Sequence, residues 1–305
     1  HSLCQPIIAL SERRIVGYEA LSRGPSNSPL HSPIALFAVA RQAGRLNELE
    51  IACRASACRR FNEQKLPGKL FLNVSPESLL EAAHQPGRTL QLLQDFGIPP
   101  SQVVIELPEQ TPTDDFQLLQ NALHHYRAMG FSIALDDLGA GYSSLRLWSE
   151  LRPDYVKIDR HFIDGIHQDA LKREFVGSIM QIAKASRAQV IAEGIELPEE
   201  LAVLTDMGVD LVQGYLLCRP QEHPPRDARN LMPKQDSSAV ALNDEGSDLS
   251  ALLIDQPAVA RNTPTATVLE AFRRQANLNS LAVLDEQGHP CGIVHRHSLS
   301  DALLK

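Results

Sequence analysis

The chain has 305 residues, of which 43% are hydrophobic and 22% are charged, and its formal net charge at pH 7 is −8. This length and composition allow about two domains with a large buried core. The acidic balance argues against duplex nucleic acid as a partner, since phosphate binding requires a basic face.

The five cysteines are odd in number and scattered, which favours reduced thiols over a disulfide framework. No apolar run approaches the length of a membrane span, and no secretory signal opens the chain. These features predict a cytoplasmic location for this segment and leave room for sensory or membrane-anchored modules outside it.

Eight short apolar runs are predicted to be strands. They cover residues 6–10, 15–21, 70–74, 103–107, 132–136, 155–158, 190–192 and 211–213. Helical patterns separate them at 34–61, 76–96, 113–129, 143–151, 162–186 and 198–207. Strand alternating with helix indicates a mostly parallel sheet, and eight repeats favour a closed (βα)₈ barrel.

The connection between the first two predicted strands is too short for a parallel crossover. Only Ser11-Glu12-Arg13-Arg14 lies between them, whereas a crossover needs about a dozen residues or more. These strands are therefore expected to pair as an antiparallel hairpin. The predicted fold is an α/β modified TIM barrel with an antiparallel first strand.

The character of the chain changes after Pro220. Residues 221–250 are polar and rich in turn-forming residues, which predicts an exit helix and then a linker at 236–250. A small α/β module is predicted for 251–305, with a helix at 265–275, strands at 280–285 and 292–295, and a final helix that has barely begun. The predicted barrel domain accordingly spans 1–235.

An acid, amide or amine stands at the carboxyl end of most of the apolar runs. In a parallel barrel these ends converge on one mouth, where catalytic groups collect. Polar side chains at such positions call for a partner. The candidates are Glu19, Asn73, Glu106, Asp136, Asp137, Lys157, Glu193 and Gln213.

Taken singly, several of these residues have ordinary explanations. The Asp136–Asp137 pair alone is typical of a solvated surface turn, Asn73 of a turn amide, and Lys157 of a salt-bridged side chain. Glu106 is different, because a carboxylate between two aliphatic residues must be paired or ligated. Acids repeated at matching barrel positions favour a metal site.

Five carboxylates exceed the usual needs of one Mg²⁺ and fit two cations about 3.5–4 Å apart, the arrangement used for in-line displacement at phosphate. Such cations would lower the pKa of a bound water molecule, and the resulting hydroxide would attack phosphorus. They would also stabilise the charge that develops on the phosphate oxygens. Lys157 would hold the nucleophile or a phosphate oxygen. The candidate residues, which would form a ring around the barrel mouth, include no Cys or His, and this argues against a zinc site.

Several motifs resemble those of a known family. They are Gln5-Pro-Ile7, Tyr18-Glu-Ala-Leu-Ser-Arg23, Leu72-Asn-Val-Ser75, Ile105-Glu-Leu-Pro-Glu109, Asp136-Asp-Leu-Gly-Ala-Gly-Tyr-Ser-Ser144, Val156-Lys-Ile-Asp159, Ala192-Glu-Gly-Ile-Glu196 and Val212-Gln-Gly-Tyr215. Together they resemble EAL domains, the bacterial cyclic di-GMP phosphodiesterases. The resemblance implies cleavage of cyclic di-GMP to linear pGpG, two Mg²⁺ or Mn²⁺ ions per site with Ca²⁺ inhibitory, a barrel with a reversed first strand, and a homodimer.

The resemblance also implies roles for individual residues. The implied metal ligands are Glu19, Asn73, Glu106, Asp136, Asp137 and Glu193, with Glu193 also a candidate general base. The implied substrate contacts are Gln5, Arg23 and Asp159. The remaining residues of the implied catalytic set are Lys157 and Gln213, beside the attacking water, and Glu109 and Glu196, which brace the 136–144 loop.

Three positions depart from the family pattern. Leu138 stands where Phe is common, and Ala140 and Pro108 stand where Thr is common. These changes remove contacts rather than charge, so a slower rate is expected with the ligand set intact. An active enzyme is favoured over a catalytically silent cyclic di-GMP receptor, and an unrelated barrel phosphohydrolase is the third interpretation.

The tail resembles a CBS motif. The matching segments are Thr263-Pro-Thr-Ala-Thr-Val-Leu-Glu-Ala-Phe272 and Leu281-Ala-Val-Leu-Asp-Glu-Gln-Gly-His-Pro-Cys-Gly-Ile-Val294. CBS motifs work in pairs and often bind adenine nucleotides, so the single motif implies pairing in trans or with a following copy. A plain dimerisation module is the alternative to a regulatory nucleotide site.

Overall fold

The computed structural model of the protein describes residues 1–75, 77, 88–108, 116–139, 144–232, 258–274 and 280–295. The chain divides into two compact units, His1–Lys234 and Gln235–Lys305. None of the helices in the described ranges combines the length and apolar character needed to cross a membrane. The predicted linker at 236–250 lies outside the described residues. Residues 221–232 form turns and bends, so the exit helix predicted after Pro220 is wrong for this stretch.

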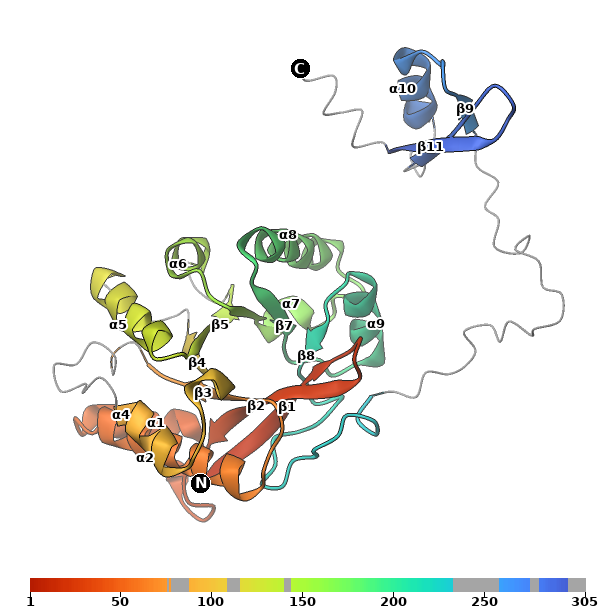
Figure 1. Cartoon of the computed structure of the whole chain (residues 1–305). Coiled ribbons are helices and arrows are strands. Elements are labelled where there is room, and N and C mark those ends of the chain that lie inside the picture. Colours follow the sequence, from red (N-terminus) through yellow and green to blue (C-terminus); the bar gives the residue numbers. More distant parts are fainter. Residues whose placement is uncertain are drawn as a thin grey trace. The chain divides into compact units, whose positions relative to one another are not determined.

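The first unit is a closed barrel of eight strands, arranged in chain order and surrounded by helices (Figure 1). This confirms the predicted architecture. The strands are β1 (Ser2–Ala9), β2 (Arg14–Ser22), β3 (Lys69–Asn73), β4 (Val103–Pro108), β5 (Ser132–Leu138), β6 (Tyr155–Ile158), β7 (Gln189–Ala192) and β8 (Leu211–Val212).

Strand β1 runs antiparallel to both of its neighbours, as the short connection to β2 requires. The other neighbouring strands pair in parallel. In the hairpin register, Gln5 of β1 lies opposite Glu19 of β2. The reversed strand therefore carries a polar side chain to the same level as the end of β2.

The strands are buried on both faces, which explains why they read as continuous apolar runs rather than as alternating ones. Phe71 and Val104 belong to a compact cluster in the barrel interior. Leu70 and Ile105, their neighbours in sequence, belong to the larger core that lies beneath the helices. This two-residue alternation fixes which side chains face inward.

The helices cover the outside of the barrel (Figure 1). They are α1 (Pro33–Gln42), α2 (Leu46–Glu63), α4 (Arg88–Asp95), α5 (Phe116–Ala128), α6 (Ser144–Leu151), α7 (Arg160–Ile163), α8 (Ala170–Ser186) and α9 (Pro198–Asp206), with 3₁₀ turns at Pro29–His31 and Pro100–Gln102. Two predicted helices prove to be divided. Gly44, at φ 65°, separates α1 from α2, and Gly165, at φ 71°, follows the single turn of α7.

The second unit contains a three-stranded sheet in the order β11-β10-β9. Its elements are β9 (Ala258–Ala260), α10 (Thr265–Arg274), β10 (Ser280–Leu284) and β11 (Pro290–His295). Its described core is small and consists of Val268, Phe272 and Leu281. The sequence did not predict β9, and the final helix expected at the chain's end lies outside the described residues.

Candidate metal centre

The alternation of side chains along each strand directs the candidate ligands into the barrel. Val104 faces the interior, so Glu106, two residues later, faces the same way; Ala134 and Asp136 are related in the same manner. The same step relates Phe71 to Asn73, Tyr155 to Lys157, Ile191 to Glu193, and Leu211 to Gln213. The polar residues thus form the next inward-facing layer, at the carboxyl ends of the parallel strands.

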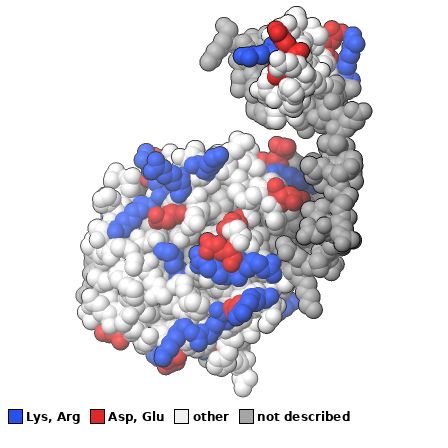
Figure 2. Space-filling model, turned by 45° about the vertical axis from the view of Figure 1, so that its right-hand side comes forward, with Lys and Arg blue, Asp and Glu red and all other residues white. Residues whose placement is uncertain are grey.

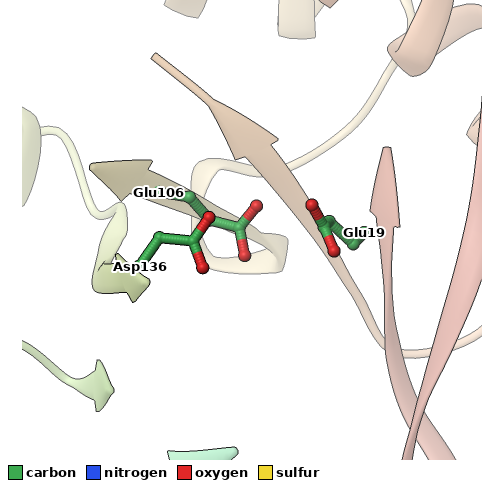
Figure 3. Close-up of side chains that lie close together, drawn as sticks. All are labelled: Glu19, Glu106 and Asp136. Atoms are coloured by element: carbon green, nitrogen blue, oxygen red, sulfur yellow. The ribbon is translucent and has the colours of Figure 1, made fainter. Parts of the chain in front are cut away.

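Three buried acids from different strands point toward one another at this end (Figure 3). Glu19 comes from β2, Glu106 from β4 and Asp136 from β5, and each offers a carboxylate oxygen within 4.8 Å of the others. A second group, Asp136, Asp137 and Glu193, meets the same distance. Asp136 therefore belongs to both groups, as expected of a residue that bridges two adjacent cation positions.

A bulge at the end of β5 lets two successive aspartates serve the same site. The pairing of β5 with β6 shifts between Leu135 and Leu138, and Asp137 has a φ of 55°. In a regular strand, adjacent side chains point to opposite faces of the sheet. The bulge re-aims one of them, so that both carboxylates reach Glu193.

Lys157 lies among the acids and is 1% exposed. Its Nζ is 2.7 Å from Glu193 Oε1, 2.8 Å from Glu106 Oε1, 3.0 Å from Asp136 Oδ1 and 3.4 Å from Glu19 Oε2. One ammonium thus serves four carboxylates and cannot neutralise them.

The outer surface has a different distribution of charge. On the face shown in Figure 2, groups of Lys and Arg side chains alternate with Asp and Glu.

Two amides complete the inner ring. Asn73 Nδ2 donates to Glu19 Oε1 at 3.2 Å and to Glu106 Oε2 at 3.1 Å. Gln213 Nε2 donates to Glu19 Oε2 at 2.7 Å and to Gln5 Oε1 at 3.0 Å. A 180° turn of the Asn73 amide would present its oxygen at the same place, so this side chain can act as donor or ligand.

Burial and mutual repulsion disfavour the ionised acids. Burial, opposed by Lys157, raises the pKa of Glu106 and of Glu193 well above the ordinary value. Burial and then the neighbouring Asp136 raise the pKa of Asp137 to about 6. Burial lowers the pKa of Lys157, but the surrounding carboxylates raise it by a larger amount. The pKa of Lys157 therefore lies well above the usual range, and the side chain stays charged.

The residues fit hard divalent cations. Glu106 Oε1 and Asp136 Oδ1 are buried and accept no hydrogen bond of ordinary geometry from the part of the chain that the structure describes, although the Lys157 ammonium lies beside them. Carboxylate and amide oxygens are the donors preferred by Mg²⁺, Mn²⁺ and Ca²⁺. The ring contains neither Cys nor His, which does not suit zinc.

The other predicted site residues occupy supporting positions. Gln5 links Gln213 to the backbone, since its Nε2 donates to the Cys218 carbonyl at 2.9 Å. Arg23 Nη1 donates to the Ser22 carbonyl at 2.8 Å. Asp159 caps α7 by accepting from His161 N, and Glu196 pairs with Arg160 at 2.9 Å. Glu109 and Ala140 lie outside the described residues.

A cavity of about 150 Å³ adjoins Asn73, and its wall contains an ion pair, Glu50–Arg54. The sequence did not predict this pair. Arg54 and Glu50 are both buried and lie 3.2 Å apart on α2. Glu50 also accepts from Ser75 N at 3.2 Å, which ties α2 to the end of β3. The available signal was the opposite charges four residues apart in a helical pattern.

Glu200 of α9 holds the loop that follows Glu193. Its carboxylate accepts backbone hydrogen bonds from Gly165 at 2.9 Å, Glu196 at 3.0 Å and Leu197 at 3.1 Å. Burial alone would raise the pKa of Glu200, but these three donors lower it below the ordinary value. This buried acid thus anchors the β7–α9 loop to the turn after α7.

Glu200→Gln is expected to lower the free energy of unfolding at neutral pH by about 2 kcal/mol, because the NH₂ group that replaces one carboxylate oxygen cannot accept the backbone bonds made to that oxygen. Since the folded-state pKa of Glu200 is depressed, its contribution is present above the unfolded pKa and is lost as pH falls through the folded pKa. Urea denaturation from pH 7 to pH 3 should therefore show the difference shrinking on acidification. Glu199→Gln, at an exposed neighbouring position, is the control; equal stability of the two variants at pH 7 would contradict this role.

Comparison with known families identifies both units. The pattern of the EAL domain matches residues 3–220, and that of the CBS domain matches residues 250–305. Cyclic di-GMP phosphodiesterase PdeF of Escherichia coli strain K12 is 31% identical over 223 residues, which make up 72% of this chain and 30% of PdeF. The blue light- and temperature-regulated antirepressor BluF of the same strain is 27% identical over 220 residues, 72% of this chain and 54% of BluF. The chain therefore spans less than two thirds of each of these relatives.

Solved structures show the same barrel. BlrP1 of Klebsiella pneumoniae, in a manganese and cyclic di-GMP complex, matches with a TM-score of 0.67 at 31% identity, covering 72% of this chain and 55% of that chain. A calcium and cyclic di-GMP complex of the same protein gives the same values.

Proposed function

Because the chain belongs to the EAL domain family, we propose that its barrel hydrolyses one phosphodiester of cyclic di-GMP to give linear pGpG. The observation that carries this proposal is the buried group of Glu19, Glu106 and Asp136, extended by Asp137 and Glu193. The group lies at the barrel mouth, where catalytic residues of such barrels are found. The relative PdeF, which is named a cyclic di-GMP phosphodiesterase, supports the choice of substrate.

We propose two Mg²⁺ or Mn²⁺ ions as cofactors, with Ca²⁺ inhibitory. The two acid groups share Asp136. The side-chain oxygens of the five acids and of Asn73 would be the metal-binding atoms. When bound, divalent cations provide a water of lowered pKa and stabilise negative charge on the phosphate. Solved complexes of BlrP1 with manganese and with calcium, each containing cyclic di-GMP, support a divalent metal in this family.

The chain's own residues then orient the reactants. Lys157 and Gln213 lie against the acids, where an ammonium and an amide can hold the attacking water or a phosphate oxygen. Glu193, with its pKa raised by burial, is suited to accept a proton from that water. Arg23, the residue after β2, is proposed to bind a substrate phosphate.

The remaining assignments are supporting ones. Gln5 and Asp159 are proposed to border the substrate, and Glu109 and Glu196 to brace the 136–144 loop. The cavity beside Asn73 is lined in part by Phe37 and has an ion pair, Glu50–Arg54, in its wall. We propose that it receives one guanine base of the substrate, because a guanidinium can donate to the oxygen and nitrogen acceptors of guanine.

Incubation of the protein with cyclic di-GMP and Mn²⁺, followed by chromatography of the nucleotides, tests the function. Linear pGpG that forms with Mn²⁺ and not after chelation is the expected result. Tight binding of cyclic di-GMP without any product would indicate a receptor instead. Failure to bind cyclic di-GMP would overturn both the enzyme and the receptor and would indicate a barrel that acts on a different substrate.

A catalytically silent receptor is the second candidate, and two observations favour it. One relative, BluF, is named an antirepressor rather than a phosphodiesterase. In addition, Leu138 is buried where it pairs with Ile158, so the position next to Asp137 carries an aliphatic rather than an aromatic side chain. The filled set of acids favours the enzyme.

We further propose a homodimer and a regulatory role for the CBS unit. Leu171 and Phe175 are exposed on α8, and Leu145 is exposed on α6, which provides apolar surface for a second copy. Sedimentation analysis tests the dimer, and a monomer at all concentrations would exclude it. Calorimetric titration with ATP distinguishes an adenine nucleotide site in the CBS unit from a plain dimerisation module.

A further inference from the structure

The single helical turn α7 lies between the two segments that carry Asp137 and Glu193. It begins directly after β6, the strand of Lys157, and Asp159 caps it by accepting from His161 N at 2.9 Å. The 136–139 segment ends β5, and the 193–197 segment follows β7, so these segments extend from the two strands that flank β6. The turn is therefore placed to contact both.

Phe162 of α7 presses against the first of these segments at Gly139. This glycine has a φ of 101°, and a Cβ added there would stand 2.1 Å from Phe162 Cε2. The ring thus touches the backbone two residues beyond Asp137. Phe175 of α8 packs edge-on against the same ring, with the centroids 5.6 Å apart, and supports it from the side of α8.

Arg160 of α7 makes the equivalent contact with the second segment at Gly194. This glycine has a φ of 70°, and a Cβ added there would lie 2.5 Å from Arg160 Cγ. The Arg160 guanidinium also pairs with Glu196 at 2.9 Å. The backbone next to Glu193 is therefore held by the stem of Arg160 and by its charged end.

We infer that α7 is a clamp in which Phe162 and Arg160 act as positioning residues for the second metal group. Each presses a positive-φ glycine one or two residues from a ligand, and together they fix the separation of the Asp137 and Glu193 carboxylates. The Glu19–Glu106 side of the site is built on β2 and β4, away from this turn. Loss of a clamp residue should therefore weaken one cation position more than the other.

This inference rests on the proposed metal site but not on turnover, so its test measures ion binding. Mn²⁺ titration of the full chain, with free Mn²⁺ followed by electron paramagnetic resonance, gives the number of bound ions and their affinities. In Phe162→Ala, the affinity of one of the two Mn²⁺ ions should fall about 10-fold, the loss typical when an outer partner of a metal ligand is removed. Phe162→Leu, which keeps an apolar side chain and folds more readily, should show a smaller loss at the same ion.

Phe131→Ala is the matched control. Phe131 is buried and, like Phe162, makes an edge-on ring contact, here with Tyr126 at a centroid distance of 5.2 Å, but it precedes β5 at the far end from the aspartates. It should lose stability while keeping the wild-type affinity for both ions. Unchanged Mn²⁺ affinities in both Phe162 variants would overturn the clamp while leaving the proposed function intact. Absence of Mn²⁺ binding by the wild type would overturn the metal site and the clamp with it.

Discussion

Glu19→Ala is expected to lower the rate of the proposed cyclic di-GMP hydrolysis by more than about 100-fold. Removing a residue that only supports a metal ligand costs up to about 100-fold, and loss of a ligand itself should cost more. Glu19 is buried, belongs to the first acid group, and accepts from both Asn73 and Gln213. Its removal therefore takes away a proposed ligand and leaves two amides without their common acceptor. Steady-state formation of pGpG with saturating Mn²⁺ measures the effect.

The control for this variant is Glu48→Ala on α2. Glu48 is exposed and pairs with Arg45 three residues away, so its removal should leave the rate unchanged. Thermal unfolding of both variants shows whether the barrel is intact. Full activity in a folded Glu19→Ala protein would contradict the assignment of Glu19 as a ligand.

Lys157→Met should make the stability of the barrel strongly dependent on divalent metal. Without added metal, the four carboxylates around Nζ lose their shared cation, and removing one partner from a buried ion pair costs about 3–5 kcal/mol. Added Mn²⁺ replaces part of the missing positive charge. The rise in melting temperature on Mn²⁺ addition should therefore be larger for the variant than for the wild type.

Hydrolysis by Lys157→Met should stay low even in Mn²⁺, because a methionine cannot hold a water or a phosphate oxygen. Lys184→Met, at an exposed position on α8, serves as the control and should behave as the wild type in both measurements. If Mn²⁺ raised the melting temperature of Lys157→Met no more than that of the wild type, the ammonium would not be the compensating charge of this site.

The barrel and its ring of polar residues could be predicted because both depend on short-range rules. A four-residue connection excludes a parallel crossover, and this alone determines the reversal of β1. Each candidate ligand lies in the carboxyl-terminal half of a strand or just past its end, so the topology that brings these ends together also assembles the side chains. Glu106 gave the clearest signal, because a carboxylate within an aliphatic run needs a partner.

The features that the sequence did not reveal depend on contacts between distant segments. The turn of Asp137 toward the site needs the bulge between β5 and β6. The division of the predicted 162–186 helix depends on Gly165, whose backbone N–H is bound by Glu200 of a later helix. The buried pair of Glu50 and Arg54 resembles any surface i,i+4 pair until the position of α2 is known.

The reversal of β1 has a practical consequence for protein engineering. Because β1 runs against β2, Ser2 lies opposite Ser22, and the amino terminus of the chain bonds to the carbonyl of Arg23 at 2.8 Å. In an all-parallel barrel the first residue would emerge at the opposite pole. Any segment joined to His1, such as a fluorescent reporter, therefore starts beside Arg23, at the same end of the barrel as the buried acids.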